Sequence, residues 1–293
     1  MIISAILFSS SEVSAQQLTV GEKSNEDLQV RIDKNGTAHV THIVQGNSYV
    51  PVHVETIRGN MTNFSVTDTG NNTIQYLTVQ KLPITILIPP SGRNMTIVRY
   101  DLPNIVSLND GIWQWKYLTP SDAPFTDFYF PNIDTVWDND RPVYLDGHGI
   151  REYGDVMRLE YVIDEPQVLQ NIHWQNYTFT VAVRTLSDVK QYAFDQQAMQ
   201  YSVDIVKPNS PVTVIIPQSM LGGKYVTHIN GNHLLTTVFH KNETHSWIGV
   251  RPSTNGTVQI IGTTVIPEFP VFVPLLMGIV IILVLQFRTR LFY

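Results

Sequence analysis

The stretch "YTFTVAV" (Tyr177 to Val183) decides the fold class, because an apolar side chain stands at every second position. The neighbours between these positions are polar or small. A repeat of two residues belongs to a strand with one buried face, whereas an amphipathic helix repeats about every 3.6 residues. The stretch therefore predicts a β-strand that lies on a hydrophobic core.

The same alternation occurs elsewhere in the chain, and helical periodicity is almost absent before residue 271. Turn signals separate the alternating stretches, among them Asp33–Gly36, Asn230–Gly231 and Lys241–Thr244. We therefore predict an all-β fold. Two further alternating sets are Met157, Leu159, Tyr161 and Ile163, and Met199, Tyr201, Val203 and Ile205.

One phrase recurs: "PITILIPPS" (Pro83 to Ser91) closely matches "PVTVIIPQS" (Pro211 to Ser219). Upstream, Val54–Arg58 and Val181–Arg184 precede the two copies at similar spacing. The repeat favours two related β-sandwich domains in tandem, both Ig-like. We place them at residues 16–165 and 166–265, with the boundary in Asp164–Gln167, and expect a single C-terminal transmembrane helix after them.

Composition narrows the classes of function. The 293 residues carry a net charge of -6, contain no cysteine and are 15% charged, against about 25% in average soluble domains. Absence of cysteine excludes disulfides, thiol catalysis and Cys-ligated zinc. The mild acidity, without a basic face, argues against a nucleic-acid partner.

The N-terminus begins MIISAILFSSSEVSAQQ, with a short apolar core from Ile2 to Phe8. Val13 and Ala15 supply the small residues that a signal peptidase recognises. We expect residues 1–15 to be a signal peptide that is cleaved after Ala15. The alternative interpretation of the apolar core is a buried N-terminal strand.

The C-terminal segment from Val271 to Phe287 contains no charge. At about 1.5 Å per residue it spans about 25 Å, which is at the short end for a transmembrane helix. Arg288 and Arg290 follow it directly. The positive-inside rule therefore places residues 288–293 in the cytoplasm and the preceding chain outside the cell. A buried core helix would need a polar face, and this segment has none.

Between the last strand pattern and this segment stands "VIPEFP" (Val265 to Pro270). Its two prolines can continue neither a helix nor a central strand, so residues 266–270 form a juncture. A Pro-Glu-Phe motif, a hydrophobic helix and a basic end together resemble the PEF-CTERM sorting signal of archaeal cell-surface proteins. The resemblance implies removal of the tail by an archaeosortase and attachment to a lipid. The residues that carry it are Pro267, Glu268, Phe269, Arg288 and Arg290.

Asn-x-Ser/Thr sequons are in excess: eight occur, where composition predicts about three. Most have turn-like neighbours, so we expect an exposed, N-glycosylated surface. No sequon falls in residues 95–175, which also hold the densest aromatic run, and this interval is either core or a bare face for a partner. The acceptors are Asn35, Asn60, Asn63, Asn71, Asn94, Asn176, Asn242 and Asn255.

The chain has nine histidines, which raises the possibility of a metal site. The Asn230–Gly231 turn places His228 opposite His233, and the next turn is expected to place His240 opposite His245. His233 and His240 are seven positions apart, so they point to opposite faces and lie about 23 Å from each other. We therefore predict no zinc site.

Asp138–Asp140, with Asp134 and Asp146 nearby, could offer oxygen ligands to calcium. EF-hand spacing fails because Pro142 stands where an acceptor is needed. A solvated acidic loop is the favoured interpretation.

No catalytic signature is present: Gly-x-Ser-x-Gly, His-Glu-x-x-His, phosphate loops and dinucleotide fingerprints are all missing. We expect no enzyme, no catalytic residue, no cofactor and no metal. Trp113, Trp115 and Tyr117 share one face of a strand and are expected in the core, with a sugar-stacking surface as the alternative. The opposite face is expected to be wet, and it carries Ile112, Gln114 and Lys116.

These features together predict a membrane-anchored, N-glycosylated archaeal cell-surface protein with a structural or adhesive envelope role. The expected partners are the membrane, other envelope proteins or glycans, and no nucleic acid. The alternative is an extracellular ectodomain that binds a glycan or calcium, and a surface hydrolase has the least support.

Overall fold

A computed structural model describes residues 22–45, 49–79, 83–90, 92, 95–121, 123–154, 156–265 and 278–282. Of the expected transmembrane segment only residues 278–282 are among these, and they are helical. Within these ranges no helix combines the length and the apolar character that a membrane crossing requires. Several predicted features lie outside the described residues: the signal peptide with Ala15, Asn94, Pro267, Glu268, Phe269, Arg288 and Arg290.

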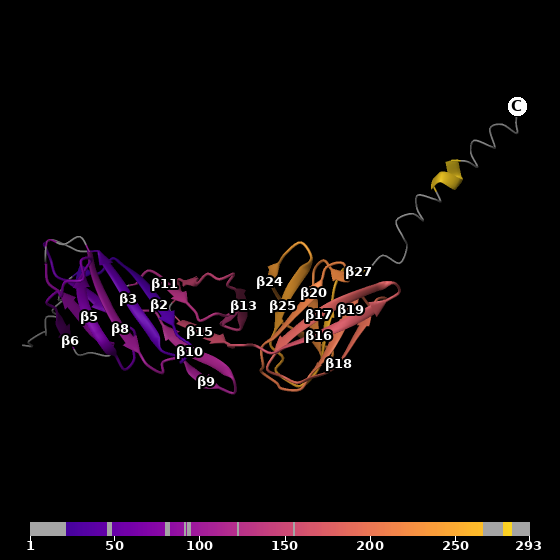
Figure 1. The fold of residues 1–293 in the computed structure, drawn as a ribbon, viewed down its shortest axis with the longest axis horizontal. Coiled ribbons are helices and arrows are strands. Elements are labelled where there is room, and N and C mark those ends of the chain that lie inside the picture. The colour runs from indigo at the N-terminus through magenta and orange to yellow at the C-terminus, as the bar shows by residue number, and fades with distance from the viewer. Residues whose placement is uncertain are drawn as a thin grey trace, which may run out of the picture. The chain divides into compact units, whose positions relative to one another are not determined.

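The described chain is built from β-strands in several sheets, so the all-β prediction is confirmed (Figure 1). It forms two compact units. Unit 1 holds the described residues up to Leu108, with Gln114–Pro131 and His148–Met157. Unit 2 holds Asn109–Trp113, Asn132–Gly147 and the described residues from Arg158 onward.

Unit 1 contains a six-stranded and a four-stranded sheet. The larger has the order β14 (Ile150–Glu152), β11 (Thr126–Tyr129), β2 (Glu26–Ile32), β3 (Ala38–Gln45), β8 (Met95–Leu102), β5 (Thr62–Asp68). The smaller has the order β1 (Glu22–Lys23), β4 (Val52–Glu55), β7 (Thr85–Ile88), β6 (Leu77–Val79). All these pairs are antiparallel except β11 with β2 and β1 with β4.

A further five-stranded sheet contributes residues to both units, because the division falls within β9, β10 and β15. Its order is β13 (Arg141–Tyr144), β12 (Thr135–Asp138), β15 (Val156–Tyr161), β10 (Ile112–Leu118), β9 (Ser107–Asn109).

Alternation along the strands produces the core of unit 1. In β2 every second residue from Glu26 to Ile32 is buried, as the period of two requires. Aromatic rings fill the space between the sheets: Phe128 lies 4.9 Å from Tyr117 and 5.9 Å from Trp115, edge to face in both pairs.

Trp115 and Tyr117 are therefore core residues, as expected from their shared face. Trp113 is only half-buried and stacks on Tyr161, with 6.3 Å between the ring centroids. The expectation that Ile112 lies on a wet face was wrong, because it is 7% exposed. The strand has buried residues on both faces where it begins.

A polar network lies inside the core of unit 1. The backbone N–H of Ile57 donates to the hydroxyl of Tyr100 (2.8 Å), and this hydroxyl lies 3.0 Å from Nε2 of His42. Nδ1 of His42 in turn lies 3.2 Å from Oε2 of Glu26, and both side chains are fully buried. One consistent arrangement has Tyr100 donating to Nε2 and His42 donating from Nδ1 to the carboxylate.

Unit 2 packs two five-stranded sheets around a second core. One has the order β16 (Gln167–Trp174), β17 (Tyr177–Thr185), β20 (Val212–Pro217), β25 (His245–Val250), β24 (Thr237–Lys241). The other has the order β18 (Val189–Asp195), β19 (Gln200–Ile205), β26 (Gly256–Ile261), β22 (Val226–Ile229), β23 (Asn232–Leu234). A short pair, β21 (Leu221–Gly222) and β27 (Thr264–Val265), completes it.

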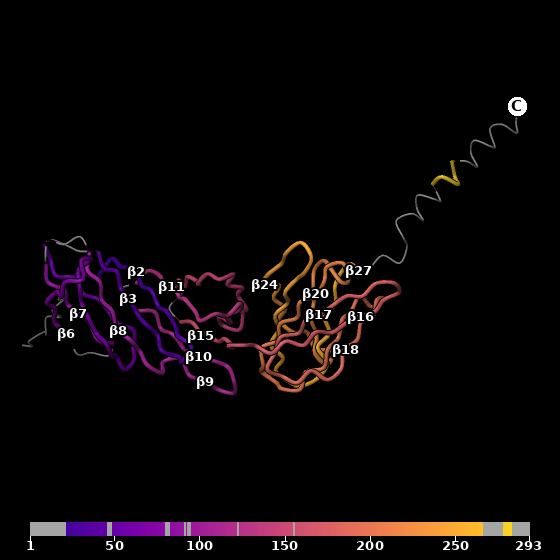
Figure 2. The backbone as a smooth tube through the Cα atoms, viewed as in Figure 1, coloured from indigo at the N-terminus to yellow at the C-terminus, as the bar shows by residue number. Residues whose placement is uncertain are grey.

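The stretch that predicted the fold class lies in β17. Val181 and Val183 are fully buried in the core, and β17 forms a long antiparallel hairpin with β16 (Figure 2). Strand β20 is buried along its whole length, which explains its nearly continuous apolar sequence.

The recurring phrase occupies comparable places in the two units. β7 pairs with β4, with Ile86 opposite Val54, and β20 pairs with β17, with Val214 opposite Val183. Each partner strand leads into a buried threonine. The hydroxyl of Thr56 donates to the carbonyl of Ile84 (2.8 Å), and that of Thr185 to the carbonyl of Pro211 (2.9 Å).

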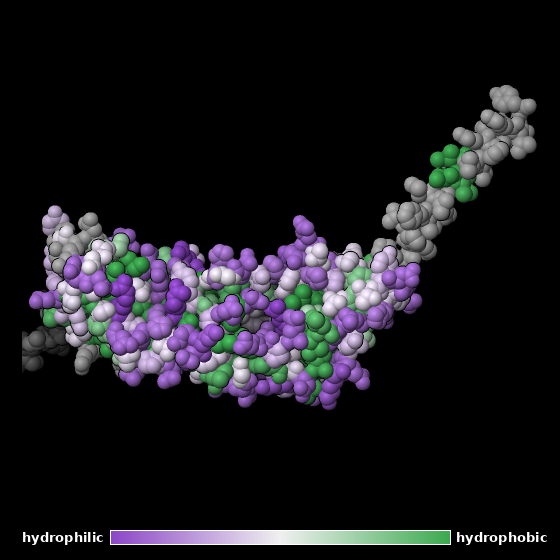
Figure 3. All heavy atoms as spheres, in the orientation of Figure 1, coloured by the Kyte–Doolittle hydropathy of each residue, from purple (hydrophilic) through white to green (hydrophobic). Residues whose placement is uncertain are grey.

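The surface of the sheets is mostly polar on the face shown in Figure 3, with smaller hydrophobic patches. In the short helical piece the apolar side chains of Ile279, Val280, Ile281 and Ile282 are exposed by 46–57%.

Candidate functional site

A polar cavity of about 230 Å³ lies within unit 2. Three segments that are distant in sequence form its walls: the start of the β12–β13 hairpin, the connection from β15 to β16, and the end of β17. The residues that line it are Asn132, Ile133, Asp134, Thr135, Trp137, Val162, Asp164, Glu165, Gln167 and Arg184.

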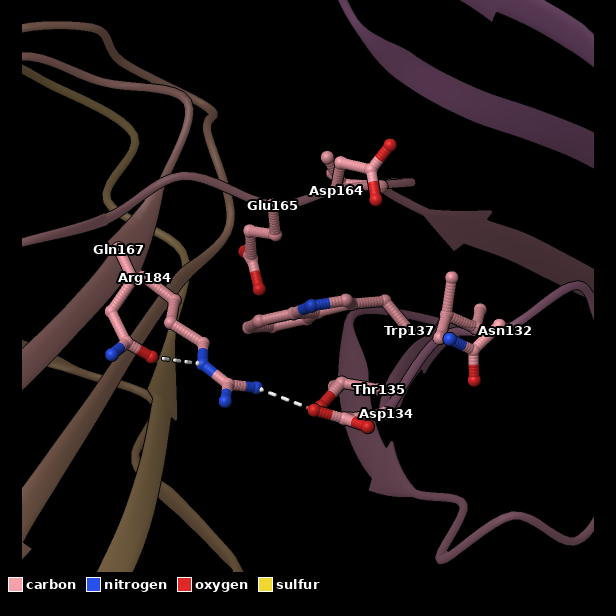
Figure 4. A pocket seen from close by; sticks show the side chains of 10 residues that line it. Asn132, Asp134, Thr135, Trp137, Asp164, Glu165, Gln167 and Arg184 are labelled. Atoms are coloured by element: carbon pink, nitrogen blue, oxygen red, sulfur yellow. Dashed lines mark hydrogen bonds and ion pairs between the residues drawn. The ribbon is translucent and has the colours of Figure 1, made fainter.

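Local backbone rules place the acidic residues of the β15–β16 connection. Asp164 has a φ of 54°, a left-handed conformation that Asp adopts in turns more readily than most residues. Glu165 precedes Pro166, and a residue before proline is biased toward extended backbone. The turn and the extended residue direct the Glu165 side chain into the cavity (Figure 4).

Arg184 connects two walls of the cavity. Its Nη1 donates to Oδ2 of Asp134 (3.0 Å), and its Nε donates to Oε1 of Gln167 (2.9 Å) (Figure 4). The Arg184 side chain is 24% exposed and that of Asp134 is 61% exposed. The pair is therefore open to solvent on one side, and we attribute a positioning role to it rather than a large contribution to stability.

Glu165 is the electrostatically unusual group of the cavity. Burial raises the pKa of its carboxyl from 4.5 to about 7, with a further increase from the charge of Asp134 and a partial opposing effect from Arg184. A carboxyl group with this pKa is present in both protonation states near neutral pH. It can therefore donate or accept a hydrogen bond there.

Trp137 forms a firm wall of the cavity, because its side chain is 3% exposed and the guanidinium of Arg251 lies 5.3 Å from its ring centroid. Arg251 is itself held by ion pairs with Glu160 and with Asp140, the latter at 3.3 Å. The hairpin that carries Trp137 also packs through Tyr144, whose ring stacks 4.0 Å from that of His240. These contacts fix one side of the cavity.

The predicted histidine geometry was half right. His228 lies opposite His233, with ring centroids 5.8 Å apart, as the Asn230–Gly231 turn requires. His240 does not face His245: Lys241 pairs with Ser246, and His240 pairs with Trp247. The reason is a turn shifted by one residue, from the expected residues 241–244 to residues 242–245, between the paired Lys241 and Ser246. Oδ1 of Asn242 accepts hydrogen bonds from the backbone N–H groups of Thr244 and His245 and so holds the turn in this place.

The acidic loop is a tight turn between β12 and β13, with positive φ at Asn139 and Asp140. Its expected solvation is incomplete, because Asp140 forms ion pairs with Arg158 and Arg251. No group of three or more His, Asp or Glu side chains among the described residues is arranged to hold a metal ion.

The sequon asparagines that the structure describes are all exposed, and all but one stand between strands. The exception lies in β5, where Nδ2 of Asn63 donates to Asp101 (2.6 Å). The exposed set is Asn35, Asn60, Asn63, Asn71, Asn176, Asn242 and Asn255.

Sequence reasoning missed the cavity. The sequence predicts a domain boundary at Asp164–Gln167 and gives these residues no role in a site, whereas in the structure Glu165 and Gln167 line the cavity with Arg184. Two local features of the sequence could have indicated a site. An Asp-Glu-Pro sequence follows an apolar strand directly, and the charged Arg184 stands near the end of another apolar strand. Nothing in the sequence joins these residues to Asp134 and Trp137.

Comparison with known proteins leaves the family open. No protein-family model matches the chain, and no curated protein matches it. Among solved structures, a multidomain protein including DUF1735 from Bacteroides ovatus matches with a TM-score of 0.18 and 10% identity. The match covers 82% of this chain and 92% of that one.

Proposed function

We propose that the chain is a glycosylated, membrane-anchored protein of an archaeal cell surface, with a structural or adhesive role in the envelope. In this proposal two Ig-like β-sandwiches stand outside the cell, a helix at residues 271–287 anchors them, and residues 288–293 remain inside before any processing. The protein is proposed not to be an enzyme.

The observation that carries the proposal is the placement of the sequons. Eight occur where about three are expected from composition, and the seven described asparagines are all exposed. Six of the seven stand in turns and loops, where a sugar chain would interrupt no strand pairing.

Mass spectrometry of tryptic peptides from the protein in its native membranes tests glycosylation. We expect glycan masses on several peptides that contain the seven asparagines. Peptides with Asn104 and Asn139 are matched controls, because these residues are exposed but outside sequons. Unmodified peptides at all seven positions would contradict the proposal.

Topology and processing have separate tests. Protease added to intact cells is expected to digest the ectodomain and to spare only a short tail fragment, whereas full protection contradicts the topology. If an archaeosortase cuts near Pro267, no peptide beyond Leu275 should occur in the mature protein. Recovery of Tyr293 in that form would indicate an ordinary membrane anchor.

A second candidate function is ligand binding, and the cavity around Glu165 favours it. A concave polar site with a carboxyl group of raised pKa and a positioned arginine is typical of binding sites. The calcium form of this candidate has weaker support, because Asp134 and Asp140 are engaged by arginines. Loss of ligand binding on substitution of a lining residue, with the fold retained, is the test. Turnover of a substrate would instead favour a surface hydrolase.

A further inference from the structure

Some hydrogen-bonding groups in the cavity around Glu165 have no hydrogen-bond partner among the described residues. Arg184 engages Asp134 and Gln167 through Nη1 and Nε, which leaves Nη2 available. The carboxyl group of Glu165 has no hydrogen-bond partner among the described residues, and the half-buried residue faces the cavity (Figure 4). A ligand or an ordered water in the cavity can therefore bond to this carboxyl.

The charge of the cavity excludes anionic ligands. Three carboxyl groups line it, those of Asp134, Asp164 and Glu165, against the single guanidinium of Arg184. Any phosphate or carboxylate would meet net repulsion, since the positive group is already paired with Asp134.

A cation is also a poor match. The ion pair with Arg184 engages Asp134, and no three acidic or histidine side chains of the described chain are placed to bind a metal together. The pKa of the Glu165 carboxyl is raised mainly by burial and not by a neighbouring charge. This carboxyl is therefore suited to a partner that can bond to it in either protonation state.

Neutral polar groups complete the lining. Asn132, Thr135 and Gln167 each bring a side chain that can both donate and accept hydrogen bonds. A ligand hydroxyl has the same dual capacity: it can donate to a carboxylate while it accepts from a guanidinium. Two neighbouring hydroxyls on one molecule can engage Glu165 and Arg184 together.

Size sets the limit on the ligand. About 230 Å³ corresponds to roughly eight waters at ~30 Å³ each, and it lies below the ~300–1,000 Å³ of pockets for larger ligands. One sugar ring is of suitable size, whereas an enclosed oligosaccharide is too large. A longer chain could enter only by its terminal residue.

We propose that this cavity binds a neutral, polyhydroxylated ligand, a single sugar residue, and that Glu165 and Arg184 hold neighbouring hydroxyl groups of it. The inference rests on the second candidate function, ligand binding, and names its ligand class.

Saturation-transfer difference NMR on the purified full chain tests the proposal, with D-glucose, D-galactose, D-mannose and N-acetyl-D-glucosamine as probes. Calcium chloride, spermidine and sodium phosphate are titrated separately and followed by tryptophan fluorescence. We expect saturable binding of at least one sugar, weakened about tenfold or more, at least 1.4 kcal/mol, in Glu165→Ala and in Arg184→Ala. Glu243→Ala is the matched control, because Glu243 is an exposed carboxylate in a turn of the same unit.

The outcomes distinguish failure of the proposed ligand class, a single sugar residue, from failure of ligand binding as a function. Sugar binding that both variants retain places the sugar elsewhere and overturns the inference. Binding of calcium, spermidine or phosphate without a sugar overturns the ligand class and leaves ligand binding in place. No binding of any probe rejects both. If Glu165→Ala or Arg184→Ala loses cooperative melting, Glu165→Leu or Arg184→Met, which keeps a longer side chain but removes the hydrogen-bonding groups, takes its place, with the same criteria.

Discussion

Arg251 donates a hydrogen bond from Nη2 to Oε2 of Glu160, although the two residues are 91 positions apart. The Glu160 side chain is 6% exposed and that of Arg251 is 18% exposed, so this ion pair lies largely out of water. The same guanidinium forms an ion pair with Asp140 and lies over the ring of Trp137. One side chain therefore holds the β12–β13 hairpin and β15 within unit 2.

Arg251→Ala should destabilise the protein by about 3–5 kcal/mol, because it leaves the buried carboxylate of Glu160 unpaired. Urea unfolding at neutral pH measures the loss. Arg158→Ala is the control: Arg158 also pairs with Asp140, but its side chain is 49% exposed, so a cost of about 0–1 kcal/mol is expected. Equal losses in both variants would mean that Glu160 is solvated.

Tyr100→Phe should cost about 1–3 kcal/mol, because the N–H of Ile57 and Nε2 of His42 both lose their buried partner. Thermal unfolding is a suitable measurement. Tyr76→Phe controls for the hydroxyl itself, since Tyr76 is 37% exposed in the same unit and should tolerate the change. An unaltered midpoint in Tyr100→Phe would show that water replaces the hydroxyl.

Glu165 should make stability depend on pH. Its pKa is about 7 in the folded protein and 4.5 without the shift, so between these values the folded state holds a proton that the unfolded state has lost. Its contribution to stability is thus present below about pH 4.5 and is lost as the pH rises through about 7. Glu165→Gln should remove this loss and stabilise the protein at pH ~8 by on the order of 3 kcal/mol.

Chemical unfolding of Glu165→Gln and the wild type across this pH range provides the comparison, with Glu243→Gln as control. Identical pH profiles for Glu165→Gln and the wild type would show that the carboxyl group is solvated and that the cavity is more open than described.

Trp115→Ala should cost about 3–5 kcal/mol, because Trp115 is 5% exposed and contacts Tyr117 and Phe128 in the core. Trp113→Ala should cost less, since the Trp113 side chain is only half-buried and stacks on one face of Tyr161. Melting curves of the two variants rank them. The reverse order would assign the core position to Trp113.

Local sequence determined the elements of this fold. Alternation at Val181 and Val183 specifies a strand with one buried face, since a period of two allows no other arrangement of a half-buried segment. Asn230–Gly231 specifies a tight hairpin, and the register that places His228 opposite His233 follows from it. These predictions depend only on interactions between residues that are a few positions apart in the sequence.

Tertiary structure alone decided the rest. The turn at Asn242 is shifted by one residue, so that Lys241 pairs with Ser246 and His240 pairs with Trp247 instead of His245. Ile112 is buried because its strand begins with neighbours on both faces, which alternation within one strand cannot reveal. The cavity depends on Glu165 and Arg184 coming from separate strands and connections. The polarity of the cavity and the raised pKa of Glu165 arise only when these segments come together in the fold. No single segment of the sequence therefore predicts them.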